Sequence, residues 1–359
     1  MPKSCPKIVF IHLLNDLSGS PKVLSQVIEI AKESQYDIDL YTSKTSGFLT
    51  QINGVNTYDI KYKLRKKKIF TLFALIYSQI RLIFLFKKYR KQNVIFYVNT
   101  LLPFGAGLAG KIYNKKVIYH IHETSISPQL WKTFLLFIVK KTASKIIYVS
   151  NFLKDEETIP SISKSVIYNS LSESFENINI SRKNRTNTIL MICSLKKYKG
   201  ILQYVALAKE FPGYNFQLIL NADEKEIESY FTQIIVPTNL KLIPKQINLH
   251  PYYAKADILI NASLPNEWVE TFGLTIIEAM AYGIPSIVPP VGGPIELVKN
   301  YSNGFCVDSS NLPLMKQKLN TLLDSKKYIE FSKNAYNESK KYNSERFKKE
   351  ITFILSEMA

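Results

Sequence analysis

The chain has few cysteines for its length of 359 residues. Cys5, Cys193 and Cys306 lie far apart and are odd in number. This spacing matches neither a set of paired disulfides nor a metal-binding cysteine motif. We therefore expect a reduced protein, because disulfide frameworks belong to oxidising compartments.

The N-terminal region lacks the pattern of a secretory signal. Charged and polar residues surround the short apolar run Ile8 to Leu14, and no small-residue cleavage site follows it. We therefore expect a cytoplasmic protein.

Acidic residues are scarce. The chain has 29 Asp and Glu against 47 Lys and Arg, which gives a formal net charge of +18. Such an excess suggests an anionic partner, which could be nucleic acid, an anionic membrane or a phosphate-bearing substrate. The alternative is a general compositional preference for lysine, and charge alone does not choose between these explanations.

The stretch 61–91 contains eleven basic residues and no acidic one, on either side of the apolar run 69–86. This run raises the question of a transmembrane span, but Ser78, Gln79 and Arg81 interrupt it near its middle. We instead expect a half-buried helix with basic ends that attaches to an anionic membrane surface. The alternative is that the helix only covers the sheet of the first half, with its lysines alone exposed. Aromatic and aliphatic residues broadly follow helical spacing at Phe70, Phe73, Ile76, Tyr77, Ile80, Ile83, Phe84 and Phe86.

Apolar runs typical of buried strands alternate with helical patterns along most of the chain. This alternation predicts an α/β fold with parallel sheets covered on both faces. A polar segment at 170–185 separates two similar halves, so we predict domains at 1–170 and 171–341, with the final helix, about 342–359, packing back on the first. Two doubly wound domains would bind a ligand in the cleft between them, at the carboxyl ends of the strands.

The most informative segment contains two carboxylates, Glu270 and Glu278. Between them, Gly273-Leu274 is expected to open a helix that ends at Gly283. The start of a helix directs free backbone N–H groups at one point, which suits a phosphate diester. Glu278 would then accept hydrogen bonds from a ribose, and the alternative is an exposed glutamate on an otherwise buried helix. The segment therefore suggests an enzyme that handles nucleotide-activated sugars.

Lys199 follows the predicted strand 188–193 and precedes a predicted helix. A lysine at such a junction can neutralise a phosphate. Lys196 and Lys197 adjoin it, so a solvated basic loop is an equally good explanation.

Three further positions belong to the first half of the chain. His120 and His122 lie on the same side of a predicted strand, so either could reach a ligand at its end. Gly19 lies in a turn-rich loop ahead of a helix predicted from about Lys22. A single glycine there is a weak signal for a phosphate-binding loop. His12 and His250 are interpreted as structural.

Together these residues resemble the family-4 retaining glycosyltransferases of GT-B fold, the glycosyl transferases group 1. The hallmark is two glutamates separated by seven residues, here Glu270 and Glu278, with Phe272-Gly273 between them and Gly292-Gly293 downstream. The resemblance extends weakly over nearly the whole chain. It implies two facing Rossmann-like doubly wound domains with an interdomain cleft.

The resemblance also implies a role for each candidate residue. Glu270 would contact hydroxyls of the donor sugar, and Glu278 would contact the ribose. Lys199 would bind the diphosphate, and His122 would lie beside the reacting sugar. The remaining donor-binding positions would be Gly19 in the loop after the first strand and the backbone of Thr271, Phe272, Gly273, Leu274 and Thr275.

One position departs from the family pattern. These enzymes usually carry an arginine five residues before the lysine, and here that position is Ser194. Phosphate neutralisation would then depend on Lys199, the helix start, and Lys196 or Lys197. This change bears on donor affinity more than on the type of reaction.

The resemblance predicts a retaining, metal-independent transferase without a cofactor. It would move a sugar from a UDP- or GDP-sugar to a saccharide or lipid-linked acceptor at the inner face of the cell membrane, in the synthesis of cell-surface polysaccharide or glycoconjugate. The alternatives are a basic nucleic-acid-binding protein, which would leave Glu270 and Glu278 unexplained, and the same fold used as a sugar-nucleotide epimerase or a glycoside phosphorylase.

Overall fold

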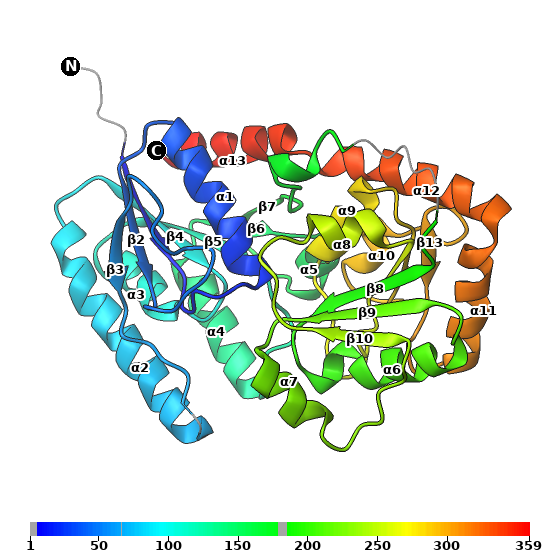
Figure 1. Cartoon of the computed structure of the whole chain (residues 1–359). Helices are drawn as coiled ribbons and strands as arrows, with labels where there is room; N and C mark the ends of the chain where they lie inside the picture. The colour runs from blue at the N-terminus through cyan, green and yellow to red at the C-terminus, as the bar shows by residue number, and fades with distance from the viewer. Residues whose placement is uncertain (1–5, 66, 179–184) are drawn as a thin grey trace. The chain divides into compact units, whose positions relative to one another are not determined.

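The computed structural model describes residues 6–65, 67–178 and 185–359. The chain divides into two compact units (Figure 1). The first comprises the residues up to Asn169 together with Glu345–Ala359, and the second comprises Ser170–Ser344.

The first unit is built on a seven-stranded parallel sheet with the strand order β3-β2-β1-β4-β5-β6-β7. The strands are β1 (Lys7–Ile11), β2 (Ile38–Thr42), β3 (Asn56–Asp59), β4 (Val94–Asn99), β5 (Lys116–Ile121), β6 (Lys145–Tyr148) and β7 (Ser163–Val166). The helices are α1 (Gly19–Glu33), α2 (Lys68–Leu85), the 3₁₀ helix η1 (Phe86–Tyr89), α3 (Phe104–Ile112), α4 (Gln129–Thr142), α5 (Asn151–Glu156) and the C-terminal α13 (Ser344–Met358).

Helix α13 contacts this first sheet although it follows the second unit in sequence. Lys145 Nζ lies 2.9 Å from Glu357 Oε2, and Lys116 Nζ donates to the Met358 carbonyl at 2.9 Å. These contacts explain why the last fifteen residues belong to the first unit.

The second unit has a six-stranded parallel sheet with the order β10-β9-β8-β11-β12-β13. Its strands are β8 (Thr188–Cys193), β9 (Asn215–Leu220), β10 (Leu240–Ile243), β11 (Ile258–Ile260), β12 (Ser286–Val288) and β13 (Gly304–Cys306). Its helices are η2 (Glu173–Phe175), η3 (Lys197–Lys199), α6 (Ile201–Glu210), α7 (Glu224–Phe231), α8 (His250–Lys255), α9 (Leu274–Ala281), α10 (Pro294–Leu297), α11 (Leu312–Leu323), α12 (Ser325–Ser339) and η4 (Lys340–Tyr342).

The central strands are buried on both faces. All six residues of β4 are buried, as are all four residues of β6. Because helices cover both faces of a parallel sheet, the side chains on both sides of each strand are apolar. Such strands appear in the sequence as continuous apolar runs and not as alternating apolar and polar residues. The predicted α/β class with two parallel sheets is confirmed.

Strand β3 and helices α5 and α10 are among the short elements that were not predicted. Strand β3, with the sequence Asn-Thr-Tyr-Asp, lies at the edge of the first sheet and is mostly exposed, so it lacks an apolar run. Helices α5 and α10 have only six and four residues, too few to show a helical period.

Helix α1 begins earlier than expected. We predicted a loop through Pro21 and a helix from about Lys22, whereas Gly19 is already the first helical residue. The proline occupies the first turn, where its missing N–H costs no helical hydrogen bond. The prediction that Gly19 lies in the preceding loop was therefore wrong by one turn.

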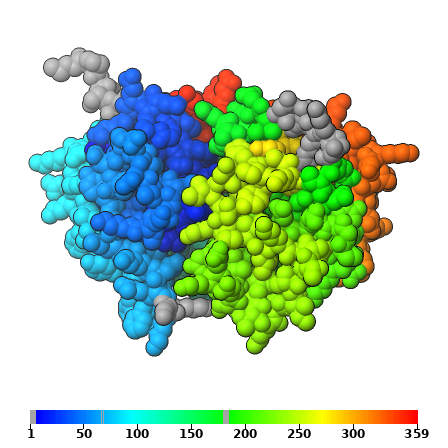
Figure 2. All heavy atoms as spheres, in the orientation of Figure 1, coloured from blue at the N-terminus to red at the C-terminus, as the bar shows by residue number. Residues whose placement is uncertain are grey.

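Helix α2 has its polar residues inside and its aromatic residues outside. Ser78 and Gln79 are buried, and Gln79 Oε1 accepts a hydrogen bond from the Gly105 backbone N–H of α3 at 2.9 Å. Phe73 and Phe84 are 62% and 71% exposed. The apolar positions that follow helical spacing thus lie mainly at the surface, where α2 appears in light blue in Figure 2.

Segment Ile69–Tyr89 is the one helix among the described residues that is long and apolar enough to span a membrane, with a mean hydropathy of 2.0.

Candidate functional site

The first group of candidate residues lies at the carboxyl ends of three neighbouring strands in the second unit, β8, β11 and β12. Lys199 ends η3, which follows β8, and Glu270 lies in the loop after β11. Lys199 Nζ is 2.7 Å from Glu270 Oε2, and both side chains are partly buried. The structure therefore joins the predicted diphosphate-binding and sugar-binding residues in one ion pair.

Two aromatic rings flank this ion pair. Tyr198 and Trp268 stack with their ring centroids 4.8 Å apart, and Lys199 Nζ lies 5.3 Å from the centroid of Trp268. An ammonium group is attracted to the face of an indole ring. The rings thus restrict the position of Lys199, and sequence analysis did not identify their role.

The loop that carries Glu270 is held by backbone contacts with Gly292 and Gly293. The Gly293 N–H donates to the Glu270 carbonyl at 2.9 Å. A Cβ on Gly292 would lie 2.2 Å from the Glu270 carbonyl oxygen, and one on Gly293 would lie 2.2 Å from that of Thr271. Gly292 also has a φ of +86°, which disfavours other residues. The double glycine therefore positions the glutamate loop.

Replacing Gly292 with alanine is expected to destabilise the protein by about 2–4 kcal/mol, through backbone strain and the clash with the Glu270 carbonyl. The matched control is Gly213→Ala, because a Cβ there meets no atom within 4 Å. The control should change stability by no more than about 0.5 kcal/mol. Urea unfolding of both variants measures the difference, and equal stability of the two would show that the Gly292 contact does not hold the loop.

Helix α9 begins as predicted at Gly273-Leu274. Gly273 has a φ of +105° and offers no side-chain cap to the first turn. The first N–H groups of a helix have no partner within it, so Leu274 and Thr275 present donors at the helix start. Just before them, Phe272 is buried and packs edge-on against Tyr342, with the centroids 5.9 Å apart. The structure thus fixes the backbone that the sequence predicted to bind phosphate.

Glu278 is buried, with 3% of its surface exposed, and lies about one turn into α9. Its Oε2 accepts a hydrogen bond from Tyr253 Oη of α8 at 2.8 Å. Burial and the adjacent carboxylate raise the pKa of Tyr253 well above its usual value, so the phenol remains a donor. The alternative that Glu278 is simply exposed is therefore wrong. Its contact with a ribose stays a prediction.

The three basic candidates around Ser194 differ in their surroundings. Lys196 and Lys197 are exposed, whereas Lys199 is partly buried against Glu270. Exposed lysines remain fully hydrated, so their contribution to phosphate binding would be smaller than that of Lys199. The difference in burial therefore favours Lys199 over Lys196 and Lys197 as the phosphate-binding lysine, a choice that the sequence left open.

The second group of candidates lies in the first unit, at the carboxyl ends of β1, β4 and β5. His122 follows β5, and its Nε2 lies 2.9 Å from Asn99 Oδ1 at the end of β4. Asn99 Nδ2 also contacts the Ser20 carbonyl at 3.2 Å and His12 Nδ1 at 3.0 Å. Asn99 therefore connects His122 with the start of α1, next to Gly19.

These contacts determine the protonation of His122. The Ser20 carbonyl can only accept, so the Asn99 amide nitrogen must face it and Oδ1 must face His122. His122 Nε2 therefore carries the proton. Burial lowers the pKa of His122 well below its ordinary value, and the nearby His120 and His12 lower it further. The ring is thus neutral near pH 7.

The other histidines of this group are also neutral. Burial lowers the pKa of His12 to about 4 and that of His120 to about 3. His120 Nδ1 is hydrogen-bonded to Tyr97 Oη at 2.8 Å, and its ring centroid is 4.2 Å from that of His122. His120 is fully buried, so it cannot reach a ligand at the end of β5. Of the two histidines, His122 is therefore the better candidate for contact with a ligand. Sequence analysis missed Asn99, because a lone asparagine after an apolar strand has no motif.

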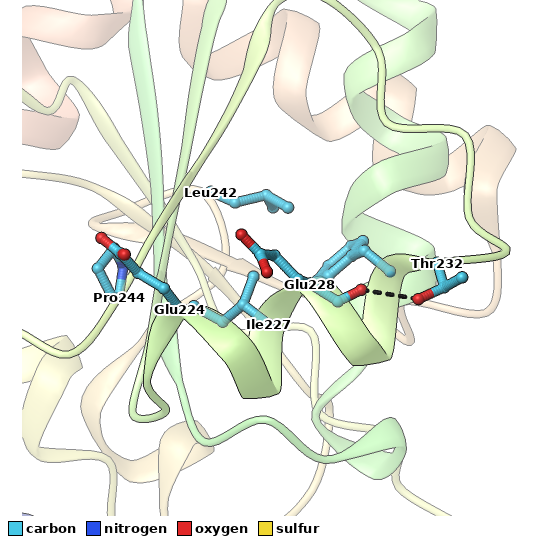
Figure 3. A pocket seen from close by; sticks show the side chains of 7 residues that line it. Glu224, Ile227, Glu228, Thr232, Leu242 and Pro244 are labelled. Carbon is cyan, nitrogen blue, oxygen red and sulfur yellow. Dashed lines mark hydrogen bonds between the residues drawn. The ribbon is translucent and has the colours of Figure 1, made fainter.

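A cavity of about 420 Å³ opens between α7 and β10 of the second unit (Figure 3). Glu224 and Glu228 lie on the same side of α7, four residues apart, and line it. Two carboxylates repel a diphosphate, so this cavity does not suit the anionic part of a nucleotide. The remaining lining residues are Ile227, Phe231, Thr232, Leu242 and Pro244.

Within the described part of the chain, no group of three or more His, Cys, Asp or Glu side chains is arranged to hold a metal ion.

The second unit is similar to known glycosyltransferases. Residues 173–342 match the family described as glycosyl transferases group 1. A probable sucrose-phosphate synthase of Oryza sativa is 34% identical over 131 residues, which are 31% of this chain and 12% of the relative. An uncharacterized glycosyltransferase of Methanocaldococcus jannaschii is 27% identical over 190 residues, 46% of this chain and 47% of that protein. The matches thus span less than half of either relative.

The fold agrees with solved structures over nearly the whole chain. The crystal structure of Anabaena HepE in complex with UDP-glucose superposes with a TM-score of 0.79 at 19% identity, covering 98% of this chain and 100% of that one. Together with the two parallel sheets, this likeness establishes the GT-B fold. Residues 173–342, the segment that matches glycosyl transferases group 1, carry the Lys199–Glu270 pair and helix α9.

Proposed function

We propose that the protein is a retaining glycosyltransferase of family 4 that moves a sugar from a UDP- or GDP-sugar to a saccharide or lipid-linked acceptor. The observation that carries the proposal is the Lys199–Glu270 pair, at 2.7 Å, beside the uncapped start of α9. The family match of the same segment supports it. HepE, whose fold is similar, was solved with UDP-glucose, which favours a UDP-sugar.

In the proposed reaction, the bond between the sugar C1 and the diphosphate oxygen breaks. Negative charge then grows on the diphosphate and positive charge on the sugar ring. The ammonium group of Lys199 and the N–H groups of Leu274 and Thr275 stabilise the diphosphate, because preorganised donors cost no reorganisation when the bond breaks. In this proposal, Lys199 and the two N–H groups stabilise the charge on the diphosphate without a metal ion or a cofactor.

Glu270 and His122 act on the sugar in this proposal. The Glu270 carboxylate accepts hydrogen bonds from sugar hydroxyls and favours positive charge on the ring. His122 is neutral, so it adds no positive charge beside a developing cation. The acceptor hydroxyl attacks on the face from which the diphosphate departs and passes its proton to the departing diphosphate oxygen, and the configuration at C1 is retained. Glu278 accepts hydrogen bonds from the ribose.

The proposal also assigns a location. The protein works in the cytoplasm, peripherally on the inner face of the cell membrane, in the synthesis of cell-surface polysaccharide or glycoconjugate. The support is the segment 61–91, with eleven basic and no acidic residues. A basic residue near an anionic lipid surface contributes roughly 1 kcal/mol to binding.

A thermal-shift screen with nucleoside diphosphates and their sugars, followed by transfer assays, tests the activity. A ligand that binds the native state raises the melting temperature by mass action. We expect one nucleoside diphosphate to stabilise the protein, and its sugar conjugate to be consumed only when an acceptor is present. Consumption without an acceptor would indicate an epimerase, and consumption of phosphate a phosphorylase. Salt-sensitive filter binding of nucleic acid, without any nucleotide effect, would replace the proposal by the nucleic-acid alternative.

A further inference from the structure

The outer surface of α2 is apolar along the whole helix. Seven of its large apolar side chains are more than 40% exposed, namely Ile69, Phe70, Leu72, Phe73, Tyr77, Ile80 and Phe84. They occupy positions that a soluble helix would normally turn toward the core. Contiguous exposed apolar surface of this kind usually marks an interaction site.

Helix α4 adds a second apolar strip to the same layer. Leu130 is 84% exposed, and Phe134 and Phe137 are also exposed. Helix α3 packs against both α2 and α4, and it contributes the exposed Ile112. All three helices follow strands that progress in the same direction across the sheet, so right-handed crossovers place them on one face of it. We define the outer surface of α2, α3 and α4 as the apolar face.

Basic residues surround this face, and acidic residues are nearly absent from its sequence. Between Asp59 and Asp155, Glu123 is the only acidic residue. Exposed basic side chains lie ahead of α2, in and just after η1, and at the end of α4, at Lys63, Arg65, Lys67, Lys87, Arg90, Lys91, Lys140 and Lys141. A partner for the apolar face must therefore be apolar where it meets the helices and anionic at the margin.

Helix α2 is fixed to the body of the first unit at its middle. A Cβ on Gly105 would lie 2.4 Å from the Gln79 backbone oxygen, so α2 and α3 touch through their backbones. Tyr113 Oη also donates to the Ile83 carbonyl at 3.0 Å. Crossing a bilayer would expose Ser78 and Gln79 to lipid and break these contacts.

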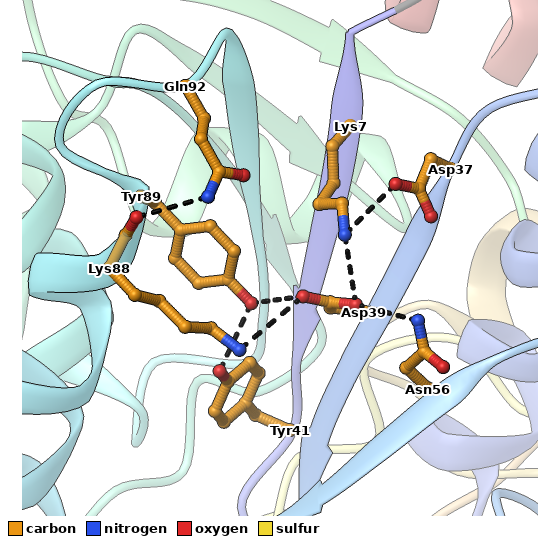
Figure 4. A network of polar contacts seen from close by, with 8 residues as sticks. All are labelled: Lys7, Asp37, Asp39, Tyr41, Asn56, Lys88, Tyr89 and Gln92. Atoms are coloured by element: carbon orange, nitrogen blue, oxygen red, sulfur yellow. Dashed lines mark hydrogen bonds and ion pairs between the residues drawn. The ribbon is translucent and has the colours of Figure 1, made fainter.

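The end of α2 is fixed by a network around the buried Asp39 of β2 (Figure 4). Tyr89 of η1 donates its hydroxyl to Asp39, and Lys88 Nζ lies 3.7 Å from the same carboxylate. Lys7 of β1 approaches it to 3.3 Å from the other side. Lys88 Nζ also lies 3.9 Å from the ring centroid of Tyr58. The sheet thus holds α2 in place with its aromatic side outward.

We propose that the apolar face of α2, α3 and α4 inserts into the interfacial layer of an anionic bilayer, with the helices lying along the membrane. A second copy of the chain does not suit this face, because pairing it with itself would bring two basic margins together. A lipid surface is apolar where it meets the helices and anionic at the margin. Its acyl chains cover the aromatic residues, and its anionic headgroups contact the lysines and arginines. The inference rests on the membrane location in the proposed function and extends it from surface attraction by residues 61–91 to insertion by the three helices of the apolar face.

Sedimentation with vesicles of phosphatidylcholine and phosphatidylglycerol in equal parts tests the inference. At about 1 M salt the Debye length falls to about 3 Å, which suppresses charge attraction but not apolar contact. We expect the wild-type protein to keep a substantial bound fraction at high salt. Complete release by salt would overturn insertion.

Single charge substitutions locate the contact. Phe73→Glu on α2 and Phe137→Glu on α4 are each expected to lower the vesicle partition coefficient at least about tenfold, because burial of a phenylalanine is lost. The matched control is Phe353→Glu on α13, where the phenylalanine is 66% exposed in the same unit. It should bind as the wild type does. Equal binding by Phe137→Glu and Phe353→Glu would remove α4 from the contact.

Two further measurements separate this inference from its alternatives. Gel filtration without lipid should show a monomer, and a dimer that Phe137→Glu dissociates would assign the face to a second copy. Nucleoside diphosphate binding, measured by thermal shift without lipid, should be the same in all four proteins. Nucleotide binding without vesicle binding would reject the inference alone, whereas vesicle binding without sugar transfer would reject the proposed function alone.

Discussion

Replacing Lys199 with alanine is expected to lower the rate of sugar transfer by about 10²- to 10³-fold, because removal of one preorganised charge contact typically costs that much in the turnover number. Lys199 is partly buried and held at 2.7 Å from Glu270, so its charge acts at a fixed point near the start of α9. Initial rates with the accepted nucleotide sugar measure the effect, with a melting curve to show that the variant is folded.

The neighbouring Lys197 provides the control, because it is exposed and belongs to the same 3₁₀ helix. Lys197→Ala should transfer sugar at a rate within about twofold of the wild type, since exposed charges are screened by solvent. If the two alanine variants have equal rates, the role assigned to Lys199 is wrong and the basic loop acts only through its total charge.

Replacing Glu270 with glutamine should have opposite effects on binding and on turnover. The substitution keeps the size of the side chain but leaves the Lys199 ammonium without its balancing carboxylate. We expect the free nucleoside diphosphate to bind roughly tenfold more tightly, which is about the strength of a partly screened ion pair. Sugar transfer should fall by at least about tenfold, because the carboxylate no longer favours positive charge on the ring.

Calorimetric titration with the nucleoside diphosphate and steady-state rates separate the two effects. Glu267→Gln is the control, because Glu267 is exposed and lies three residues earlier in the same loop. Weaker diphosphate binding by Glu270→Gln than by Glu267→Gln would mean that Glu270 organises the phosphate site rather than competing for Lys199.

The features that sequence analysis predicted well depend on local backbone requirements. Gly273 has a positive φ and precedes α9, and Gly292 allows the close approach of the Glu270 loop. Such positions tolerate few residues other than glycine, so the requirement is visible in the sequence. The parallel sheets were predictable for a similar reason, because burial of both faces leaves continuous apolar runs.

The features that sequence analysis missed depend on contacts between distant segments. Asn99 bonds to His12, 87 residues away, and Tyr253 bonds to Glu278, 25 residues away. No local pattern marks such partners. The direction of α2 was missed for another reason, since periodicity shows that two sides of a helix differ but not which side meets the core. The buried Ser78 and Gln79 satisfy each other and the α3 backbone, which makes the polar side the inner one.

The carboxylate of Asp39 has a consequence for how the first unit unfolds. Groups from β1, β3 and η1 all bind this single buried side chain. If the end of α2 and η1 unfolded, the buried Asp39 carboxylate would lose its partners from η1. Leaving a buried charge without its partners costs free energy, so the end of α2 is expected to unfold only together with the centre of the sheet. We therefore expect the backbone amides at the end of α2 to exchange with solvent deuterium together with those of β1 and β2, as one cooperative block, although most of the helix surface is accessible.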